Sequence, residues 1–344
     1  MPNNNIRLII EEKVPFVKGL FENFASVKYL PPEDITAEAV KEVDGLIIRT
    51  RTRCDKNLLE DSAVKIIATA TIGLDHIDID YCTQRGIVVA NAPGCNAPAV
   101  AQYVFSTLLH TVNRPLQSYT LGVVGVGHVG EIVARWGETF EMKVLRCDPP
   151  RHDTEGGNQW VDLDTIATQA DIITFHTPLT SGGLYPTHHL AGYDFFRKLK
   201  RAPIFINSAR GSVVDSDALI KAKRQGLVGP IIIDCWENEP TINRQLLSLT
   251  HIATPHIAGY SQAGKIRASQ VAVDAICSFF NLPTIKLDAV YPAPAATTVA
   301  KRDVLASYNP MPESRALKDD PDDFEKIRNN YELRAEVPDG HDPF

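Results

Sequence analysis

The sequence predicts an α/β protein made of two doubly wound parallel-sheet domains with a short C-terminal extension. Short apolar runs alternate with amphipathic helical stretches along most of the chain, which is the pattern of parallel sheets covered by helices on both faces. One of these units contains a glycine-rich turn at residues 125–130, in the middle of the chain. The length of 344 residues, 44% of them hydrophobic and 22% charged, is sufficient for two globular domains with full cores.

The first set of elements occupies residues 1–97. Its expected strands are residues 7–10, 27–30, 45–48, 65–69 and 87–90. Helical patterns at residues 15–24 and 36–43 lie between them. A long apolar helix at residues 261–280 can return the chain to this sheet. We therefore expect residues 1–97 and 262–290 to form one discontinuous domain that binds the substrate.

The second set begins after Pro98 and is expected to form an inserted domain over residues 98–261. A strongly apolar helix, residues 99–112, precedes strands at residues 119–124, 142–147, 170–175, 204–207 and 230–234. The remaining residues, 291–344, contain prolines and an acidic run at 319–323, and predict a loop-rich segment with one helix at 322–331. Composition alone leaves open whether this segment is mobile or docks on another part of the protein.

Composition and charge exclude several classes of function. A formal net charge of −7 disfavours a nucleic-acid or membrane partner, so an anionic ligand must be held by a local basic cluster. The six cysteines lack zinc-like spacing, and His176, His188 and His189 lack acidic or cysteine companions at metal spacing, so we expect no metal. The N-terminus has no signal-peptide hydrophobic region and no apolar run approaches a membrane span. We therefore expect a cytoplasmic protein with reduced cysteines.

The glycine-rich turn predicts a dinucleotide site, because it lies between two apolar strands and opens a helix. Gly125 permits a tight turn, Gly127 lets backbone N–H groups approach a pyrophosphate, and Gly130 lets the helix pack closely on the strand. Asp148 ends the next strand, where it would accept hydrogen bonds from a ribose and repel a 2′-phosphate, which favours NAD over NADP. The alternative is a glycine turn in some other βαβ unit. The cofactor-binding residues expected here are Gly125, Gly127, His128, Val129, Gly130 and Asp148.

Three further residues suit hydride transfer from a secondary alcohol, which needs a base for the hydroxyl proton and a cation for a neighbouring carboxylate. Arg210, Glu239 and His256 each follow an expected strand, and ligands of open α/β sheets bind at the carboxyl ends of strands. Each residue alone has a simpler interpretation: a surface charge, a helix cap and a structural histidine. Their joint order along the chain favours a catalytic set.

The order of these motifs resembles that of the D-isomer-specific 2-hydroxyacid dehydrogenase family. After the glycine turn come Asn-x-x-Arg-Gly from Asn207, Asp-x-x-x-x-Glu-Pro from Asp234 and Pro-His-Ile-x-Gly from Pro255. The resemblance implies a flavodoxin-like substrate domain and a Rossmann cofactor domain. It also implies His256 as acid/base on the substrate oxygen, Glu239 as the residue that orients it, and Arg210 as the clamp on carboxylate and carbonyl. In the same sense it places four further residues around the cofactor: Thr177, Pro178, Asp234 and Gly259.

Several short stretches resemble one branch of that family, whose members act on a phosphorylated 2-hydroxy acid and dimerise through a C-terminal domain. They are residues 68–76, 92–97, 147–151, 175–179, 185–188, 256–260 and 323–331. The resemblance implies a phosphorylated substrate and a homodimer. The C-terminal region is shorter here than is usual for that branch, so a reduced dimerisation domain is expected.

A phosphate-bearing substrate predicts a basic cluster, and Arg49, Arg51 and Arg53 alternate with threonines directly after the strand at 45–48. If the strand continued, the three arginines would share one face and could grip a phosphate. The alternative is a solvated edge strand protected from aggregation by its charges. With the hydroxyl residues that the resemblance adds, the predicted substrate-binding residues are Arg49, Thr50, Arg51, Thr69 and Tyr260.

Two other functions fit the same sequence. The enzyme could act on another 2-hydroxy acid, such as 3-phosphoglycerate or glycerate. The same fold can also serve as an NAD-sensing corepressor that binds protein partners, because a fold alone does not determine function.

Overall fold

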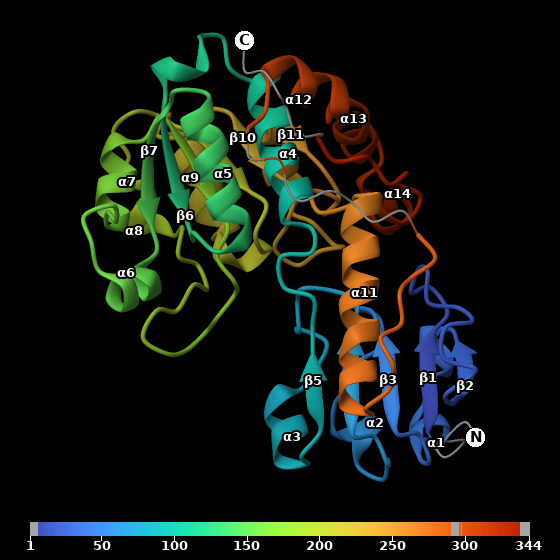
Figure 1. The fold of residues 1–344 in the computed structure, drawn as a ribbon. Coiled ribbons are helices and arrows are strands. Elements are labelled where there is room, and N and C mark those ends of the chain that lie inside the picture. Colours follow the sequence, from blue (N-terminus) through green and yellow to red (C-terminus); the bar gives the residue numbers. More distant parts are fainter. Residues whose placement is uncertain (1–5, 290–295, 297, 338–344) are drawn as a thin grey trace. The chain divides into compact units, whose positions relative to one another are not determined.

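The computed structural model describes residues 6–289, 296 and 298–337, and it divides the chain into two compact units. Unit 1 comprises residues 1–96 and 262–293, and unit 2 comprises residues 97–261 and 294–344 (Figure 1). The first five residues and the polar stretch 338–344 lie outside the described residues. In the described part of the chain, every helix is too short or too polar to cross a membrane.

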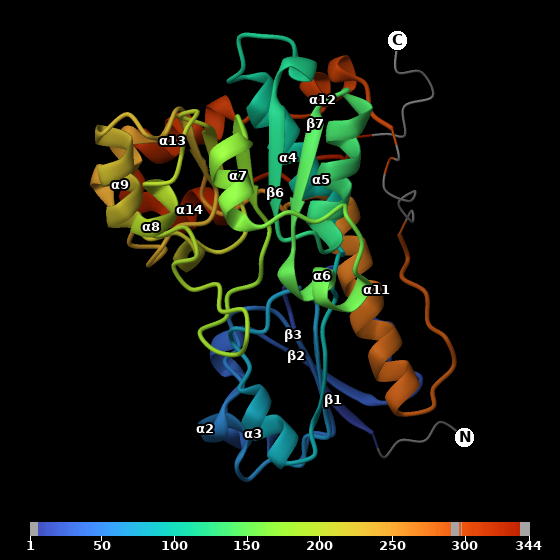
Figure 2. The same ribbon diagram turned by 90° about the vertical axis from the view of Figure 1, so that its left-hand side faces the viewer.

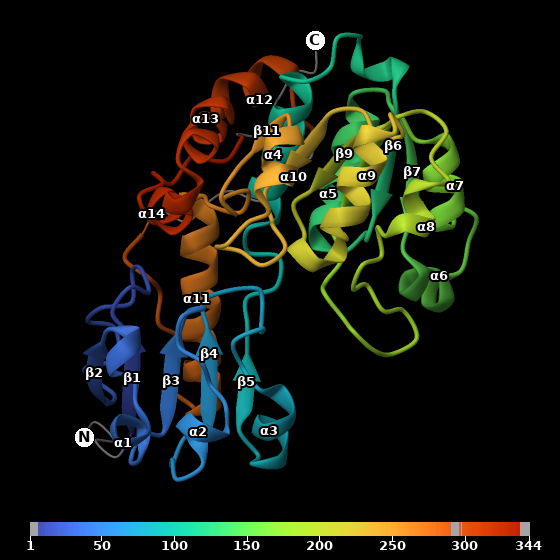
Figure 3. The ribbon, with the colours of Figure 1, turned by 180° about the vertical axis from the view of Figure 1, so that it is seen from behind.

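Unit 1 is built on a parallel five-stranded sheet of order β2-β1-β3-β4-β5. The strands are β1 (Arg7–Glu11), β2 (Ser26–Leu30), β3 (Gly45–Ile48), β4 (Ile66–Thr69) and β5 (Val88–Ala90). Their carboxyl ends lie at one edge of the sheet, as the view in Figure 3 shows. The strand order reverses at β1, so the switch point of this unit, where ligands of such sheets bind, lies between the ends of β1 and β3.

Helices cover both faces of the unit 1 sheet. The long helix α11 (Gln262–Phe279) buries Ile266, Val273 and Ile276 against β3 and β4. The short helices α1 (Ala37–Val40), α2 (Lys56–Leu59) and α3 (Ile79–Gln84) cover the opposite face. Helix α11, which follows unit 2 in the sequence, therefore completes the core of the unit 1 sheet.

Unit 2 is built on a parallel six-stranded sheet of order β11-β10-β9-β8-β6-β7. Its strands are β6 (Thr120–Val124), β7 (Lys143–Cys147), β8 (Ile172–Phe175), β9 (Ile204–Asn207), β10 (Ile231–Ile233) and β11 (Ile252–Ala253). The order reverses at β6, so the switch point lies between the ends of β6 and β8. Figure 2 shows β6 and β7 beside α5.

The helices of unit 2 form two layers over nearly continuous apolar strands, as expected for a parallel sheet. One face packs against α4 (Ala97–Leu109) and α5 (His128–Thr139), which bury Tyr103, Phe105 and Trp136. The other face carries α8 (Tyr193–Phe196), α9 (Ser216–Arg224) and α10 (Arg244–Leu249), with α7 (Leu163–Gln169) at the same core. Helix α6 (Pro149–Glu155) follows β7.

The C-terminal segment, residues 298–337, docks on unit 2. It contains α12 (Lys301–Ser307), α13 (Met311–Asp319) and α14 (Phe324–Asn329), with α12 against α4 and α13 against β11 (Figure 3). Val304, Leu317 and Phe324 are fully buried in the cores of unit 2. Among the described residues this segment is thus an integral layer of unit 2, which answers the question that composition left open.

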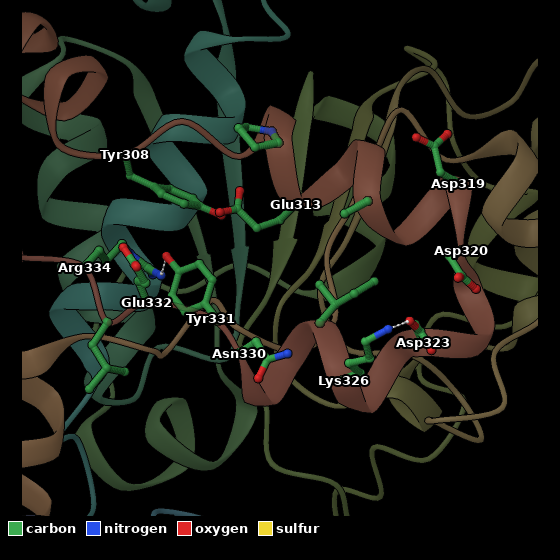
Figure 4. A pocket seen from close by; sticks show the side chains of 14 residues that line it. Tyr308, Glu313, Asp319, Asp320, Asp323, Lys326, Asn330, Tyr331, Glu332 and Arg334 are labelled. Carbon is green, nitrogen blue, oxygen red and sulfur yellow. Dashed lines mark hydrogen bonds and ion pairs between the residues drawn. The ribbon is translucent and has the colours of Figure 1, made fainter.

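A pocket of about 900 Å³ lies within this segment, between α13, α14 and the chain that follows (Figure 4). Its lining includes the buried Tyr308 and the half-buried Glu313 as well as Lys326 and Arg334. The lining comes from the C-terminal segment alone, and all of the predicted site residues lie outside it.

The α/β fold class is confirmed, but two local predictions were wrong. Residues 15–24 form successive turns instead of a helix, because Phe16 and Gly19 adopt left-handed backbone angles, with φ of 64° and 86°. Their buried neighbours Val17 and Phe21 still show helical spacing, which is what misled the prediction. The helix predicted at 322–331 is shorter and starts after a 3₁₀ turn, and two more helices precede it. The strand predicted at 45–48 is confirmed, because β3 spans the same residues.

Candidate active site

The glycine turn after β6 has the geometry of a close-packed strand–helix junction. Gly125 has φ of 83°, and a Cβ there would lie 2.7 Å from the Thr177 nitrogen. A Cβ at Gly130 would lie 2.0 Å from the Gly125 oxygen, whereas one at Gly127 would meet open space. Gly127 is also the N-cap of α5 and offers no capping side chain. Open backbone at the start of a long helix is a fitting cradle for a pyrophosphate.

Asp148 lies beside this turn. Its Oδ2 accepts a hydrogen bond from the Val126 N–H (2.8 Å), and its Oδ1 caps α6 by accepting from the Arg151 N–H (3.1 Å). Each carboxylate oxygen can accept a further hydrogen bond, so the pair can also bind two ribose hydroxyls. The nearby Arg151 is paired with Glu131 and Glu155.

Three buried polar atoms at the carboxyl ends of β8 and β9 have no hydrogen-bond partner in the described part of the chain. They are Nδ1 of His176, Oγ1 of Thr177 and Oγ of Ser208. Burial lowers the pKa of His176 to about 3, so its imidazole is neutral. Buried polar groups are rarely left unsatisfied, so these three atoms are available to bind a ligand group or a water molecule. Thr177 was predicted from the sequence with its neighbour Pro178, whereas His176 and Ser208 were not.

Asp234 directly follows β10 and organises the loop that carries His256. Its carboxylate, fully buried, accepts hydrogen bonds from the Thr254 hydroxyl (2.7 Å) and from the N–H groups of Ile257 (2.8 Å) and Ala258 (2.9 Å). Its carbonyl accepts from the His256 N–H (2.9 Å). Asp234 therefore holds the backbone from Thr254 to Gly259 in place from inside the protein.

His256 and Glu239 form an ion pair between Nδ1 and Oε1. The Glu239 carboxylate is oriented by the Trp236 N–H, which donates to its other oxygen (3.1 Å). Both side chains are about three-quarters buried, with 27% and 25% exposed. His256 has φ of 57°, a left-handed conformation that few side chains adopt outside functional positions.

The two partners shift each other's pKa. Burial lowers the pKa of His256, but the adjoining Cys235 sulfur and the Glu239 carboxylate favour its protonated form and raise it well above the ordinary value. Burial raises the pKa of the Cys235 thiol, so Glu239 carries the negative charge. Burial also raises the pKa of Glu239, yet the hydrogen bond and charge of His256 outweigh it and lower the value.

Arg210 begins the turn after β9, and this turn packs on the loop that carries Glu239. A Cβ at Gly211 would lie 2.0 Å from the Trp236 oxygen, so only glycine permits the approach. The buried Asn207 side chain ties both loops together by donating to the carbonyls of Arg210 (3.0 Å) and Cys235 (3.1 Å). The structure thus joins the loops of the predicted triad, and Asn207 is a positioning residue that the sequence analysis did not single out.

The predicted substrate residues divide between the units. Arg49, Thr50, Arg51 and Thr69 belong to unit 1, and Tyr260 belongs to unit 2. Because β3 ends at Ile48, the arginines do not continue a strand, and the shared-face prediction was wrong. The edge-strand alternative was also wrong, since β3 pairs with both β1 and β4.

Arg49 nevertheless lies at the switch point of unit 1. Its N–H donates to the carboxylate of the buried Glu11 at the end of β1 (2.9 Å), which also accepts from the Thr52 hydroxyl (3.0 Å). Arg53 pairs with Asp55, and Thr69 is fully buried, with its hydroxyl 2.7 Å from that of Thr71 and 3.3 Å from Nε2 of His76. The sequence analysis did not identify Glu11 or His76 as residues of this site.

Glu237, on the same loop as Glu239, forms a second histidine–glutamate pair with His189. Nε2 of His189 is 2.6 Å from Oε1 of Glu237, whose other oxygen accepts from the Ser216 N–H (3.3 Å). His189 therefore has an acidic companion that lies far away in sequence, which its local spacing did not show. Among the described residues, His, Cys, Asp and Glu side chains form no group of three or more that could hold a metal.

Comparison with known proteins defines the class. Residues 100–258 match the family model described as D-isomer specific 2-hydroxyacid dehydrogenase, NAD binding domain. The chain belongs to this family of NAD-dependent dehydrogenases. The match covers the glycine turn, Arg210, Glu239 and His256.

The branch that the short motifs resemble is that of the erythronate-4-phosphate dehydrogenases. The protein of that name from Bacteroides thetaiotaomicron is 46% identical over 339 residues, which cover 96% of this chain and 97% of the relative. The one from Klebsiella pneumoniae is 37% identical and covers 96% and 92%. The match extends through most of the C-terminal segment, so this segment belongs to the branch as well.

Solved structures agree with this family. D-lactate dehydrogenase from Aquifex aeolicus, complexed with NAD and lactic acid, has a TM-score of 0.69 at 28% identity and covers 80% of this chain and 95% of its own. NAD-bound 3-phosphoglycerate dehydrogenase from Entamoeba histolytica has a TM-score of 0.68 at 26% identity, with coverage of 84% and 100%.

Proposed function

We propose that this protein oxidises 4-phospho-D-erythronate to the corresponding 2-oxo-4-phospho acid with NAD, as a step of pyridoxal phosphate (vitamin B6) biosynthesis. The observation that carries the proposal is the His256–Glu239 ion pair. It adjoins the Arg210 turn at the carboxyl edge of the unit 2 sheet. The same sheet carries the open glycine turn after β6. The name of the relatives, which match this chain over nearly its whole length, supports this substrate.

In this proposal His256 is the acid/base. Its Nδ1 is held by Glu239, so Nε2 is the nitrogen that takes the proton of the 2-hydroxyl group. The imidazolium that forms is stabilised by the Glu239 carboxylate, which its hydrogen bond from Trp236 keeps in place. In the reverse direction the same imidazolium returns the proton to the 2-oxo oxygen.

Arg210 binds the carboxylate of the substrate. Its planar guanidinium can form two parallel hydrogen bonds to a carboxylate, which lysine cannot. At the switch point of unit 1, Arg49, Thr50 and Arg51 are the proposed phosphate-binding residues, because a dianionic phosphate requires local cations in a chain of net charge −7. The hydroxyl groups of Thr69 and Tyr260 are proposed to donate hydrogen bonds to the substrate.

Bound NAD would supply the acceptor for the hydride that leaves C2 of the substrate. The residues proposed to hold it are the open backbone of Gly127 with His128 and Val129, the carboxylate of Asp148, and the residues after β8 and β11: Thr177, Pro178 and Gly259. The unsatisfied Oγ1 of Thr177 fits this role. Asp234 contributes by fixing the His256 loop.

The substrate assignment is tested by steady-state oxidation with NAD and three donors: 4-phosphoerythronate, 3-phosphoglycerate and D-lactate. We expect the highest kcat/KM with 4-phosphoerythronate. A higher value with 3-phosphoglycerate would replace this assignment by the alternative substrate within the same family.

The raised pKa of His256 predicts opposite pH profiles for the two directions. Oxidation needs the neutral imidazole, so its kcat/KM is expected to rise with pH through a midpoint above 6.5. Reduction of the 2-oxo acid by NADH needs the imidazolium, so its kcat/KM should fall through the same midpoint. Glu239→Gln should lower both midpoints, because the charge that favours the imidazolium is lost. Profiles that rise together in both directions would contradict the assignment of His256.

The position of Asp148 predicts its effect on cofactor binding. Asp148→Ala should raise the Kd for NAD about 10- to 100-fold, because two hydrogen bonds to the ribose are lost, and should relax discrimination against NADP. Asp162→Ala is the matched control, because Asp162 also caps a helix of unit 2, α7, by accepting from the Thr165 N–H. Calorimetric titration with both cofactors measures the effect, and equal affinities in the two variants would refute it.

We also propose a cytoplasmic homodimer. The C-terminal segment exposes the apolar side chains of Leu305, Met311 and Leu333, which supports a contact with a second copy. Light scattering after size-exclusion chromatography tests this, and a monomer at micromolar concentration would disprove it.

A further inference from the structure

The helix α14 of the C-terminal segment carries an arginine next to the proposed substrate-binding tyrosine. Nε of Arg328 donates a hydrogen bond to the Tyr260 hydroxyl (3.1 Å), and its guanidinium carbon lies 5.9 Å from the centre of the Tyr260 ring. The Arg328 side chain is only 21% exposed, and its Nη1 pairs with Glu325 (3.3 Å). This arginine is therefore mostly withdrawn from water and fixed by two partners.

The same arginine acts electrostatically on Glu239. Burial by itself lowers the pKa of Arg328, but Tyr260 and Glu239 outweigh burial and raise it. In turn, Arg328 is one of the positive charges that lower the pKa of Glu239, after His256 itself. The titratable groups that act directly on His256 are Asp234, Cys235 and Glu239. Arg328 thus acts on His256 through its carboxylate partner.

The turn that bears Tyr260 is held by the same segment. Nη1 of Arg334 donates to the carbonyls of Ile257 (3.0 Å) and Tyr260 (3.1 Å), and to the Tyr331 hydroxyl (3.0 Å), a bond drawn in Figure 4. The Tyr331 ring meets the Tyr260 ring edge-on at 6.2 Å. The backbone and the ring of Tyr260 are therefore both fixed by the C-terminal segment.

We propose that Arg328 is a positioning residue of the active site, which aims the Tyr260 hydroxyl at the anionic substrate and adds positive charge beside the Glu239–His256 pair. The inference rests on the proposed function. Because the phenol oxygen accepts from Arg328, its O–H is directed to another acceptor, and a carboxylate or phosphate oxygen of the substrate is such an acceptor. The C-terminal segment then completes the site of its own chain.

The test compares Arg328→Gln and Arg328→Lys with Arg315→Gln, a control at an exposed arginine of the same segment. Arg328→Gln should raise KM for the phosphorylated hydroxy acid about tenfold, the cost of one charged hydrogen bond, and leave the Kd for NAD unchanged. It should also raise the pH midpoint of kcat/KM, because the Glu239 carboxylate, without the charge of Arg328 beside it, becomes more basic and holds the proton of His256 more strongly. Arg328→Lys should restore the midpoint.

A double-mutant cycle with Tyr260→Phe isolates the coupling. If Arg328 acts through the phenol, the KM of the double variant should not exceed that of Tyr260→Phe alone. Additive effects on KM, or a midpoint unchanged in Arg328→Gln, would overturn the proposal.

A readout without turnover separates this inference from the proposed function. NMR titration of the His256 imidazole in cofactor-free protein, assigned by its loss in His256→Asn, should show a higher midpoint in Arg328→Gln and the wild-type midpoint in Arg315→Gln. A protein that fails to oxidise 4-phosphoerythronate but shows this shift would refute the substrate and retain the role of Arg328. A protein that oxidises 4-phosphoerythronate but shows no such shift would retain the substrate and refute the role of Arg328.

Discussion

Replacement of His256 by alanine is expected to lower kcat for oxidation by about 10²- to 10⁴-fold, the usual contribution of a positioned general acid/base. The imidazole is the group that Glu239 holds and that carries a strongly raised pKa, so its removal takes away the proton acceptor. The Kd for NAD should change little, because the proposed cofactor contacts lie on other residues. Stopped-flow measurement of NADH formation and titration of NAD by protein fluorescence measure the two quantities.

Two controls separate chemistry from structure. His256 adopts a left-handed conformation, which costs a residue with a side chain about 1–2 kcal/mol and which alanine tolerates less well than histidine. Asparagine tolerates this conformation, so His256→Asn should lose activity to the same extent with less loss of stability. His251→Ala removes an exposed histidine just before β11 and should retain activity. Comparable activity in His256→Asn and wild type would show that the imidazole is not the base.

Except for the two-residue strand β11, which was not predicted, the strands of both sheets could be predicted within a residue or two, because continuous apolar runs bounded by turn residues admit few other interpretations. Strand 204–207 agrees fully with β9, and the predicted ends of the long helix differ by one residue from those of α11. Residues 15–24 show the limit of this reasoning. Their apolar spacing satisfies a helix, but two left-handed residues turn the chain instead.

The candidate site shows a similar division. Residues directly after strands, such as Arg210 and His256, could be proposed because parallel strands end at one edge. The contacts that hold them could not, because they join residues far apart in sequence. Asn207 bridges to Cys235, Glu237 pairs with His189, and Arg328 reaches Tyr260. Such pairs leave no local signal. The arginine-face prediction failed because the end of β3 depends on the buried carboxylate of Glu11, which binds the backbone at Arg49.

Arg334 is the residue whose loss should most reduce stability. Its side chain is buried and donates to the carbonyls of Ala99 (3.0 Å), Ile257 (3.0 Å) and Tyr260 (3.1 Å), as well as to Ala258 and to Oε1 of Gln102 (3.0 Å). Its guanidinium also lies 4.5 Å from the centre of the Tyr308 ring. It therefore joins three parts of unit 2: the start of α4, the turn after His256 and the C-terminal segment.

Arg334→Met should lower the free energy of unfolding of unit 2 by about 3–5 kcal/mol, because several buried carbonyls lose a charged donor at about 1–3 kcal/mol each, partly offset by relaxation. Urea unfolding followed by tryptophan fluorescence measures this, since Trp136, Trp160 and Trp236 all belong to unit 2. The matched control is Arg302→Met, an arginine of α12 with 77% of its side chain exposed, for which we expect less than about 0.5 kcal/mol. Equal losses in the two variants would mean that the C-terminal segment adds little to the stability of the site. A large loss confined to Arg334→Met, with weaker substrate binding in the surviving folded protein, is the result expected if one buried cation holds both the segment and the Tyr260 turn.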